Sequence, residues 1–149
     1  MANTYTQLYI QIVFSTRNRR PVIHEKIRND VQKYITGIIQ KEGSKVMAIY
    51  ANPDHLHILI GLNPSTSLSS LVQKIKANSS RWLKQKGFVS QNFEWQKGYG
   101  AFSYSRSELN RVIDYILKQP EHHKKLNYKE EYLNLLKEFD VQYDPKYVF

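Results

Sequence analysis

Two histidines separated by one residue, His55 and His57, have the spacing in this sequence that most directly suggests chemistry. Residues 55–62 alternate in the manner of a β-strand, in which side chains two apart point the same way. Both imidazoles would then share one face, and the other face would carry Leu56, Ile58 and Ile60. Two neighbouring neutral imidazoles can hold a divalent ion and leave further coordination positions free. An ordinary pair of surface or hydrogen-bonded histidines is the alternative at this point.

A second group of polar residues recurs at helical spacing in residues 107–119. Tyr115 and Gln119 are i and i+4, and Arg111 lies one turn earlier, so the three share one side of a helix. One helix would thus present a hydroxyl nucleophile, a neutral oxygen ligand and a cation. A tyrosine hydroxyl, with a free pKa of about 10, needs a metal-polarised phosphate or a nearby cation or base to react. Spacing alone does not select Tyr115 from eleven tyrosines.

The elements that must position these residues follow from the apolar periodicity. We predict strands at residues 5–15, 45–51, 55–62 and 93–105, the last bent at its glycines. Helices are predicted at 27–40, from 64 onward, at 107–119 and near 130–139, and Pro120 should end or kink the third.

The order of the first six elements is the βαββαβ arrangement of ferredoxin-like domains, an α+β fold. We expect residues 1–149 to form a single domain with an antiparallel sheet, helices on one face and additional C-terminal helices. The other face, with His55 and His57, is expected to be open to substrate or to a second subunit.

Composition excludes several classes of protein. There are no cysteines, so disulfides, thiolate metal sites and a cysteine nucleophile are ruled out. No apolar run reaches the roughly 18 residues of a membrane span, and residues 1–4 lack the pattern of a signal peptide. We therefore expect a cytoplasmic protein with no membrane partner.

The formal net charge of +9 is concentrated before residue 120. Residues 64–86 hold five Lys or Arg and no acidic residue, and a second basic group lies at residues 17–20. Such a positive field favours a polyanionic partner, although a solvated surface explains it equally well. The candidate DNA-binding residues are Arg17, Arg19, Arg20, Lys74, Lys76, Arg81 and Arg111.

The histidine and tyrosine segments together resemble a known family. Residues 53–59 (PDHLHIL), 95–103 (WQKGYGAFS), 112–119 (VIDYILKQ) and 121–125 (EHHKK) are similar to the single-tyrosine HUH transposases of small bacterial insertion sequences, the IS200-like family. The similarity runs from the first strand to near the end of the chain. It is far more specific than either motif alone.

The resemblance implies roles that spacing does not establish. It implies that His55 and His57 bind Mg²⁺ or Mn²⁺, that Gln119 is a third metal ligand, and that Tyr115 attacks the scissile phosphate to give a 5′-phosphotyrosine and a free 3′-hydroxyl. The implied substrate is single-stranded DNA folded into imperfect hairpins. The implied enzyme is a homodimer whose active site is shared between chains, although pairing of Tyr115 within one chain stays open.

Some neighbouring residues receive weaker interpretations. Asp54 is interpreted as a turn residue or a support for the ligands rather than a ligand, because it points to the opposite strand face. His122 and His123 are alternative ligands or bases, but a basic helix end shared with Lys124 and Lys125 is preferred.

Three rival functions are kept open. A non-catalytic module that binds single-stranded nucleic acid would explain the charge and the aromatic residues. A domesticated relative could bind or process hairpins without moving an element. A phosphoesterase that activates water is less favoured, because this chain has only one histidine pair of this spacing.

Overall fold

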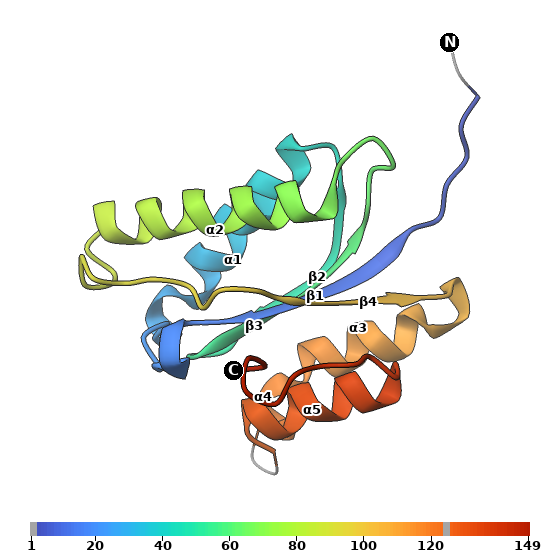
Figure 1. Cartoon of the computed structure of the whole chain (residues 1–149). Helices are drawn as coiled ribbons and strands as arrows, with labels where there is room; N and C mark the ends of the chain where they lie inside the picture. The colour runs from blue at the N-terminus through green and yellow to red at the C-terminus, as the bar shows by residue number, and fades with distance from the viewer. Residues whose placement is uncertain (1–2, 124–125) are drawn as a thin grey trace.

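The computed structural model describes residues 3–123 and 126–149, and its core is a four-stranded antiparallel sheet (Figure 1). The strand order is β2-β3-β1-β4, which confirms the ferredoxin-like α+β prediction. The strands are β1 (Tyr9–Ser15), β2 (Lys45–Ala51), β3 (His55–Gly61) and β4 (Gly100–Tyr104). The helices are α1 (Glu25–Lys41), α2 (Leu68–Gln85), α3 (Leu109–Leu117), α4 (Gln119–His122) and α5 (Tyr128–Glu138).

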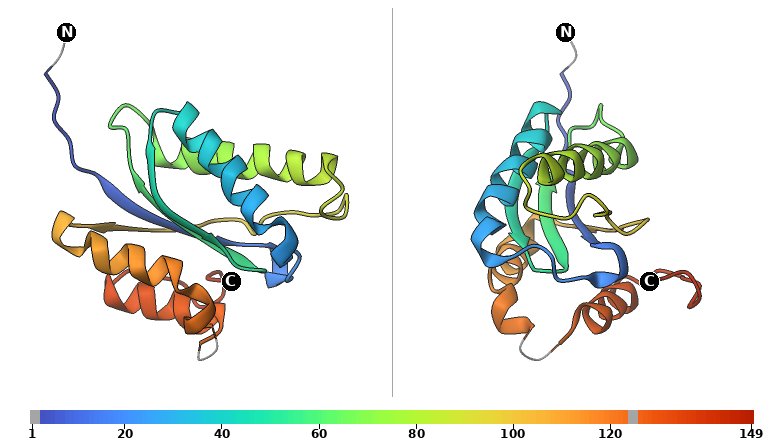
Figure 2. Two further views of the ribbon diagram at one scale, coloured as in Figure 1. Left: turned by 180° about the vertical axis from the view of Figure 1, so that it is seen from behind. Right: turned by 90° about the vertical axis from the view of Figure 1, so that its left-hand side faces the viewer.

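Helices α1 and α2 cover one face of the sheet (Figure 2). Their apolar stripes pack on alternate residues of β3, and the Ser67 side chain caps α2 by accepting a hydrogen bond from the Ser70 backbone N–H. The core on this side includes Ile12, Phe14, Ile35, Ile39, Leu56, Ile58, Ile60, Leu71 and Ile75.

The opposite face is covered as well, so the expectation of an open face was wrong. Helices α3 and α5 lie across it (Figures 1 and 2). Both helices carry apolar stripes, and packing on the sheet buries these stripes away from water. They bury Val112, Ile116, Leu135 and Leu136 against Val13, Leu59 and Phe102 of the sheet. No helix within residues 3–123 and 126–149 has the length and apolar character to cross a membrane.

Two local features bear on the site. The predicted strand 93–105 is regular only from Gly100. Before it, Gly98 has a positive φ of 84°, and the Lys76 ammonium donates to the carbonyls of Gln96 and Gly98 at 2.8 and 2.6 Å. The predicted break at Pro120 is confirmed: α3 ends at Leu117 and the short helix α4 restarts the chain in a new direction.

Candidate metal centre and nucleophile

The two histidines of β3 lie side by side on the face that α3 and α5 cover. His55 pairs in register with Ser15 of β1, and His57 pairs with Val13. Their ring centroids are 5.2 Å apart, and their exposed fractions are 1% and 0%. The prediction that both imidazoles share one face, away from the core under α1 and α2, is therefore confirmed. They are buried, however, rather than displayed on an open surface.

His123 and Glu131 complete a cluster around these imidazoles. Glu131 Oε1 lies 2.8 Å from His57 Nε2, 3.2 Å from His55 Nε2 and 3.3 Å from His123 Nε2. One donor atom from each of the four residues lies within 4.8 Å of the others. The Glu131 side chain is only 2% exposed. The cluster is thus a buried meeting point of three imidazole nitrogens and one carboxylate oxygen.

The donor atoms have the chemistry and spacing of a divalent-ion site. Imidazole and carboxylate groups are ligands for transition ions, and carboxylates also suit Mg²⁺ and Mn²⁺. An octahedral ion with ligand distances of about 2.1 Å places adjacent donors about 3 Å apart. The three contacts to Glu131 Oε1 span 2.8–3.3 Å. The cluster fits a divalent metal ion on both counts.

In each histidine of β3, the ring nitrogen that points away from the cluster is hydrogen-bonded to an oxygen acceptor. His55 Nδ1 donates to Asp54 Oδ1 at 2.7 Å, and His57 Nδ1 donates to Gln11 Oε1 at 2.8 Å. With Nδ1 engaged in this way, both Nε2 atoms face the cluster. The interpretation of Asp54 as a support for a ligand fits this geometry.

Burial and charge shift the pKa values within the cluster. Burial would lower the pKa of His55, but hydrogen bonds and charge from Asp54 and Glu131 outweigh it, so that pKa is raised. The pKa of His57 is lowered, because its burial outweighs the attraction of Glu131. Burial would raise the pKa of Glu131, but the hydrogen bonds from the three histidines hold it far below its usual value.

Tyr115 reaches this cluster from α3 of the same chain. Its hydroxyl donates to Glu131 Oε2, and its ring stacks on His122 with centroids 4.3 Å apart. A cavity of about 190 Å³ beside the hydroxyl is lined in part by Arg111 and Tyr104. Burial, followed by the negative charge of Glu131, raises the pKa of Tyr115 well above 10. The hydroxyl therefore needs a positive charge nearby before it can ionise.

Gln119 lies in the cluster as well, because the break at Pro120 turns its side chain toward the sheet. It is fully buried. Its Oε1 accepts from Asn52 Nδ2 at 3.0 Å and lies 2.9 Å from His123 Nε2, and its Nε2 donates to Glu131 Oε2 at 3.3 Å. Its role as a metal ligand stays a prediction.

Sequence reasoning missed Glu131 and misjudged His123. The preferred interpretation of His123 as part of a basic helix end was wrong, because the turn of α4 brings its ring back to the cluster. Lys124 and Lys125, the other members of that proposed helix end, lie outside the described residues. A signal for Glu131 was present: it is a charged residue within the apolar stripe of α5, which holds Tyr128, Tyr132 and Leu135.

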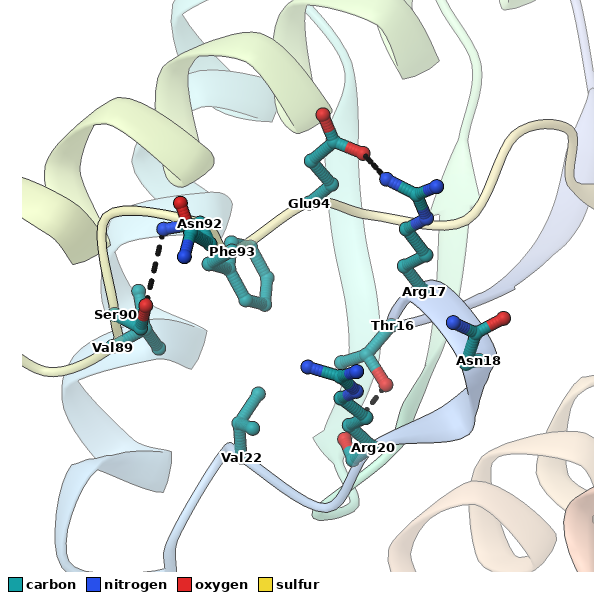
Figure 3. Close-up of a pocket in the computed structure, with 10 residues that line it drawn as sticks. All are labelled: Thr16, Arg17, Asn18, Arg20, Val22, Val89, Ser90, Asn92, Phe93 and Glu94. Atoms are coloured by element: carbon teal, nitrogen blue, oxygen red, sulfur yellow. Dashed lines mark hydrogen bonds and ion pairs between the residues drawn. The ribbon is translucent and has the colours of Figure 1, made fainter.

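The predicted DNA-binding residues fall into separate groups. The loop with Arg17, Arg19 and Arg20 adjoins the cluster, because the Thr16 backbone N–H donates to the Asp54 carbonyl. Arg17 pairs with Glu94 at 2.6 Å beside a pocket of about 380 Å³. Arg20 extends toward this pocket (Figure 3).

The α2 group (Lys74, Lys76 and Arg81) lies over the other face of the sheet. Lys74 pairs with Glu42 at 2.9 Å, and Lys76 holds the loop before β4. Arg111 pairs with Glu108 at 3.0 Å beside Tyr115.

Comparison with known proteins places this chain in a family. Residues 4–119 match the family described as "Transposase IS200 like". The chain is 26% identical over 129 residues to the transposase for insertion sequence element IS200 of Salmonella typhimurium, covering 83% of this chain and 84% of the relative. It is 22% identical to the ISDra2 transposase TnpA of Deinococcus radiodurans, covering 76% and 84%.

A similar fold occurs in a solved structure of a REP-associated tyrosine transposase bound to a REP hairpin. The TM-score is 0.62 at 18% sequence identity, over 85% of this chain and 74% of the other. The match to the family extends from before β1 into α4, and so includes the histidine pair and the tyrosine helix. The chain therefore belongs to the IS200-like transposase family.

Proposed function

We propose that this chain cuts and rejoins single-stranded DNA, with Tyr115 as the nucleophile and a divalent ion held by His55, His57 and Glu131. One contact carries the proposal: the Tyr115 hydroxyl donates to the carboxylate whose other oxygen meets both histidines. A hydroxyl, a carboxylate and two imidazoles converge here in a site that is otherwise buried. Gln119 and His123 are further candidate ligands, because both side chains reach the same cluster.

The proposed chemistry is a transesterification at a DNA phosphate. The Tyr115 oxygen forms a bond to phosphorus while the bond from phosphorus to the 3′-oxygen breaks. The phenol gives up its proton, and the freed 3′-oxygen takes up a proton to become a hydroxyl. A bound divalent ion supplies positive charge that polarises the phosphate and offsets the charge of Glu131, which otherwise opposes ionisation of Tyr115. Reversal of the same step joins strands.

This chain's own residues bind and orient the reactants. Glu131 fixes the direction of the Tyr115 hydroxyl. Arg111 lines the cavity beside that hydroxyl and is placed to meet a phosphate there. The basic loop at Arg17, Arg19 and Arg20 adjoins the same end of β3 and is the favoured contact for the DNA backbone.

A DNA hairpin is the proposed substrate, since a protein of similar fold is bound to a REP hairpin. The metal is proposed to be Mg²⁺ or Mn²⁺, with Mn²⁺ bound more tightly, because imidazole donors favour the transition ion. We propose that the site is complete within one chain. We also propose that residues 1–149 form a single domain and that the protein is cytoplasmic. A homodimer remains compatible with this arrangement, with each copy carrying its own site.

A test is the covalent product on a denaturing gel. The protein is incubated with Mn²⁺ and a panel of labelled single-stranded hairpins with flanking sequence. We expect a shifted protein–DNA band that Tyr115→Phe and His57→Ala abolish. Matched controls on the far side of the molecule, Tyr34→Phe on α1 and His24→Ala in the exposed turn before it, should keep the band.

Other outcomes favour the rivals. Tight binding without a band on any hairpin favours a non-catalytic or domesticated binding protein. Cleavage without attachment that survives Tyr115→Phe favours attack by water.

A further inference from the structure

Gln11 occupies a position behind the cluster that the proposed chemistry does not use. It is the third residue of an interior strand, β1, and it is 1% exposed. Its polar character in an alternating strand is typical of a solvent-facing residue. Here α3 and α5 cover that face, and the amide is sealed between His57 and Tyr104.

The amide makes one hydrogen bond at each end. Gln11 Nε2 donates to the Tyr104 hydroxyl at 2.7 Å, which leaves Oε1 as the atom 2.8 Å from His57 Nδ1. A carboxamide oxygen only accepts hydrogen bonds, so His57 must carry its proton on Nδ1. His57 Nε2, which lies 2.8 Å from Glu131 Oε1, is then the ring nitrogen that faces the cluster.

The other histidine has an equivalent support. Asp54 Oδ1 accepts from His55 Nδ1 at 2.7 Å, and a carboxylate, like the amide oxygen, has no proton to give. The two supports reach the ring nitrogens from different segments, β1 and the turn before β3. Both leave Nε2 as the nitrogen that faces the cluster, where a bound metal ion would take the place of a proton between the imidazoles and Glu131.

We propose that Gln11 is a positioning residue for the metal site: it holds His57 in the Nδ1–H tautomer with Nε2 aimed at the ion, and Tyr104 holds the amide in that orientation. The inference rests on the proposed metal site. Without Gln11, the His57 ring is free to place its proton on Nε2 or to rotate away. Either change costs metal affinity while leaving every ligand present.

The experiment is Mn²⁺ binding by isothermal titration calorimetry. Gln11→Leu keeps the approximate volume but removes the acceptor, and we expect Mn²⁺ to bind about 10–100-fold more weakly. Gln11→Glu keeps an oxygen acceptor and should bind Mn²⁺ at least as tightly as the wild type. The matched control is Gln32→Leu, which removes an amide oxygen on α1, the helix that covers the opposite face of the sheet from the cluster; this oxygen accepts from the Ala51 backbone N–H. Its affinity for Mn²⁺ should not change.

A spectroscopic readout separates positioning from general damage. In the Mg²⁺-saturated protein, imidazole nitrogen NMR should show hydrogen-bonded Nδ1–H protons on both His55 and His57. Gln11→Leu should remove or shift the His57 signal and leave that of His55 in place. Should Gln11→Leu fail to fold, Tyr104→Phe, which removes a single oxygen, is expected to weaken Mn²⁺ binding several-fold.

The possible failures are distinct. If the wild type binds no divalent ion, the proposed function fails. If the wild type binds Mn²⁺ and a folded Gln11→Leu binds equally well, the role of Gln11 is overturned and the proposed function survives. Equal losses in Gln11→Glu and Gln11→Leu would mean that Gln11 only fills space, and a His57 proton found on Nε2 would overturn the inference directly.

Discussion

Mixing two inactive variants decides whether the active site belongs to one chain. Tyr115→Phe lacks the nucleophile and His57→Ala lacks a metal ligand. The Tyr115 hydroxyl donates to Glu131 of its own chain, whose carboxylate lies 2.8 Å from His57 of that chain. Each variant therefore carries one broken site, and a mixture should contain no intact one.

The alternative predicts a definite yield. If the tyrosine helix of each chain served the histidines of its partner, random mixing would make about half of all dimers mixed, and each mixed dimer would hold one intact site out of two. About a quarter of the wild-type activity would return. The assay is the yield of covalent protein–DNA product after the two variants are coexpressed with different tags and purified together.

The controls for mixing are variants outside the site. Coexpressed Tyr34→Phe and His24→Ala should give full product, which shows that tags and coexpression do no harm. Product near a quarter of the wild-type yield from the two site variants would refute the reasoning. Background yield at every mixing ratio is the expected result.

Three further predictions concern stability and metal binding. The folded-state pKa of Glu131 lies below its usual 4.5, so its contribution to the stability of the metal-free protein is complete above about pH 4.5 and is lost as the pH falls. The free energy of unfolding should then change by up to about 1.4 kcal/mol per pH unit. Urea unfolding curves recorded in chelator measure this slope, and Glu131→Gln should remove it. Ser79→Ala removes the acceptor of the buried Trp95 indole N–H at 3.0 Å and should cost about 1–3 kcal/mol in urea unfolding, whereas Ser80→Ala should stay within about 0.5 kcal/mol. Mn²⁺ at about 100 times its Kd should stabilise the fold by about 2.7 kcal/mol and raise the Tm by about 5–10 °C. If Mn²⁺ raises the Tm of His57→Ala as much as that of the wild type, the metal site is contradicted.

Local patterns in the sequence predicted the frame of the site. The alternation around His55 and His57 indicated their common face, since a strand has only two faces and the alternating Leu56, Ile58 and Ile60 belong in the core. The break beside Gln119 followed from Pro120, which cannot continue a helix hydrogen-bond ladder. These predictions depend on neighbours within a few residues, and such neighbours are visible in the sequence.

The remaining site residues depend on contacts between distant segments. Glu131 is 74 residues from His57 in the chain, and only the packing of α5 on the sheet brings them together. The same packing seals Gln11, which its strand pattern alone would place in water. Expecting an open face hid both residues: Glu131 reaches the histidines only through the packing of α5, and Gln11 was expected to face solvent rather than a buried histidine.

The charge pattern was a weak guide to which basic residues are available to bind DNA. The acid-free α2 supplied several candidate DNA contacts, yet Lys74 and Lys76 are engaged within the chain. Burial also lowers the pKa of Lys76 to about 8, which fits a residue that holds a loop better than one that faces solvent. The basic loop beside Asp54 is the better candidate because of its place near the cluster, which the sequence did not reveal.

The most direct test of the central claim is the identity of the residue that becomes joined to DNA. The covalent product formed with Mn²⁺ and a hairpin substrate is digested with protease and nuclease, and the nucleotide-bearing peptide is sequenced by mass spectrometry. We predict a phosphodiester on Tyr115. A nucleotide on Tyr104, which lines the same cavity, or on any other tyrosine would contradict the assignment.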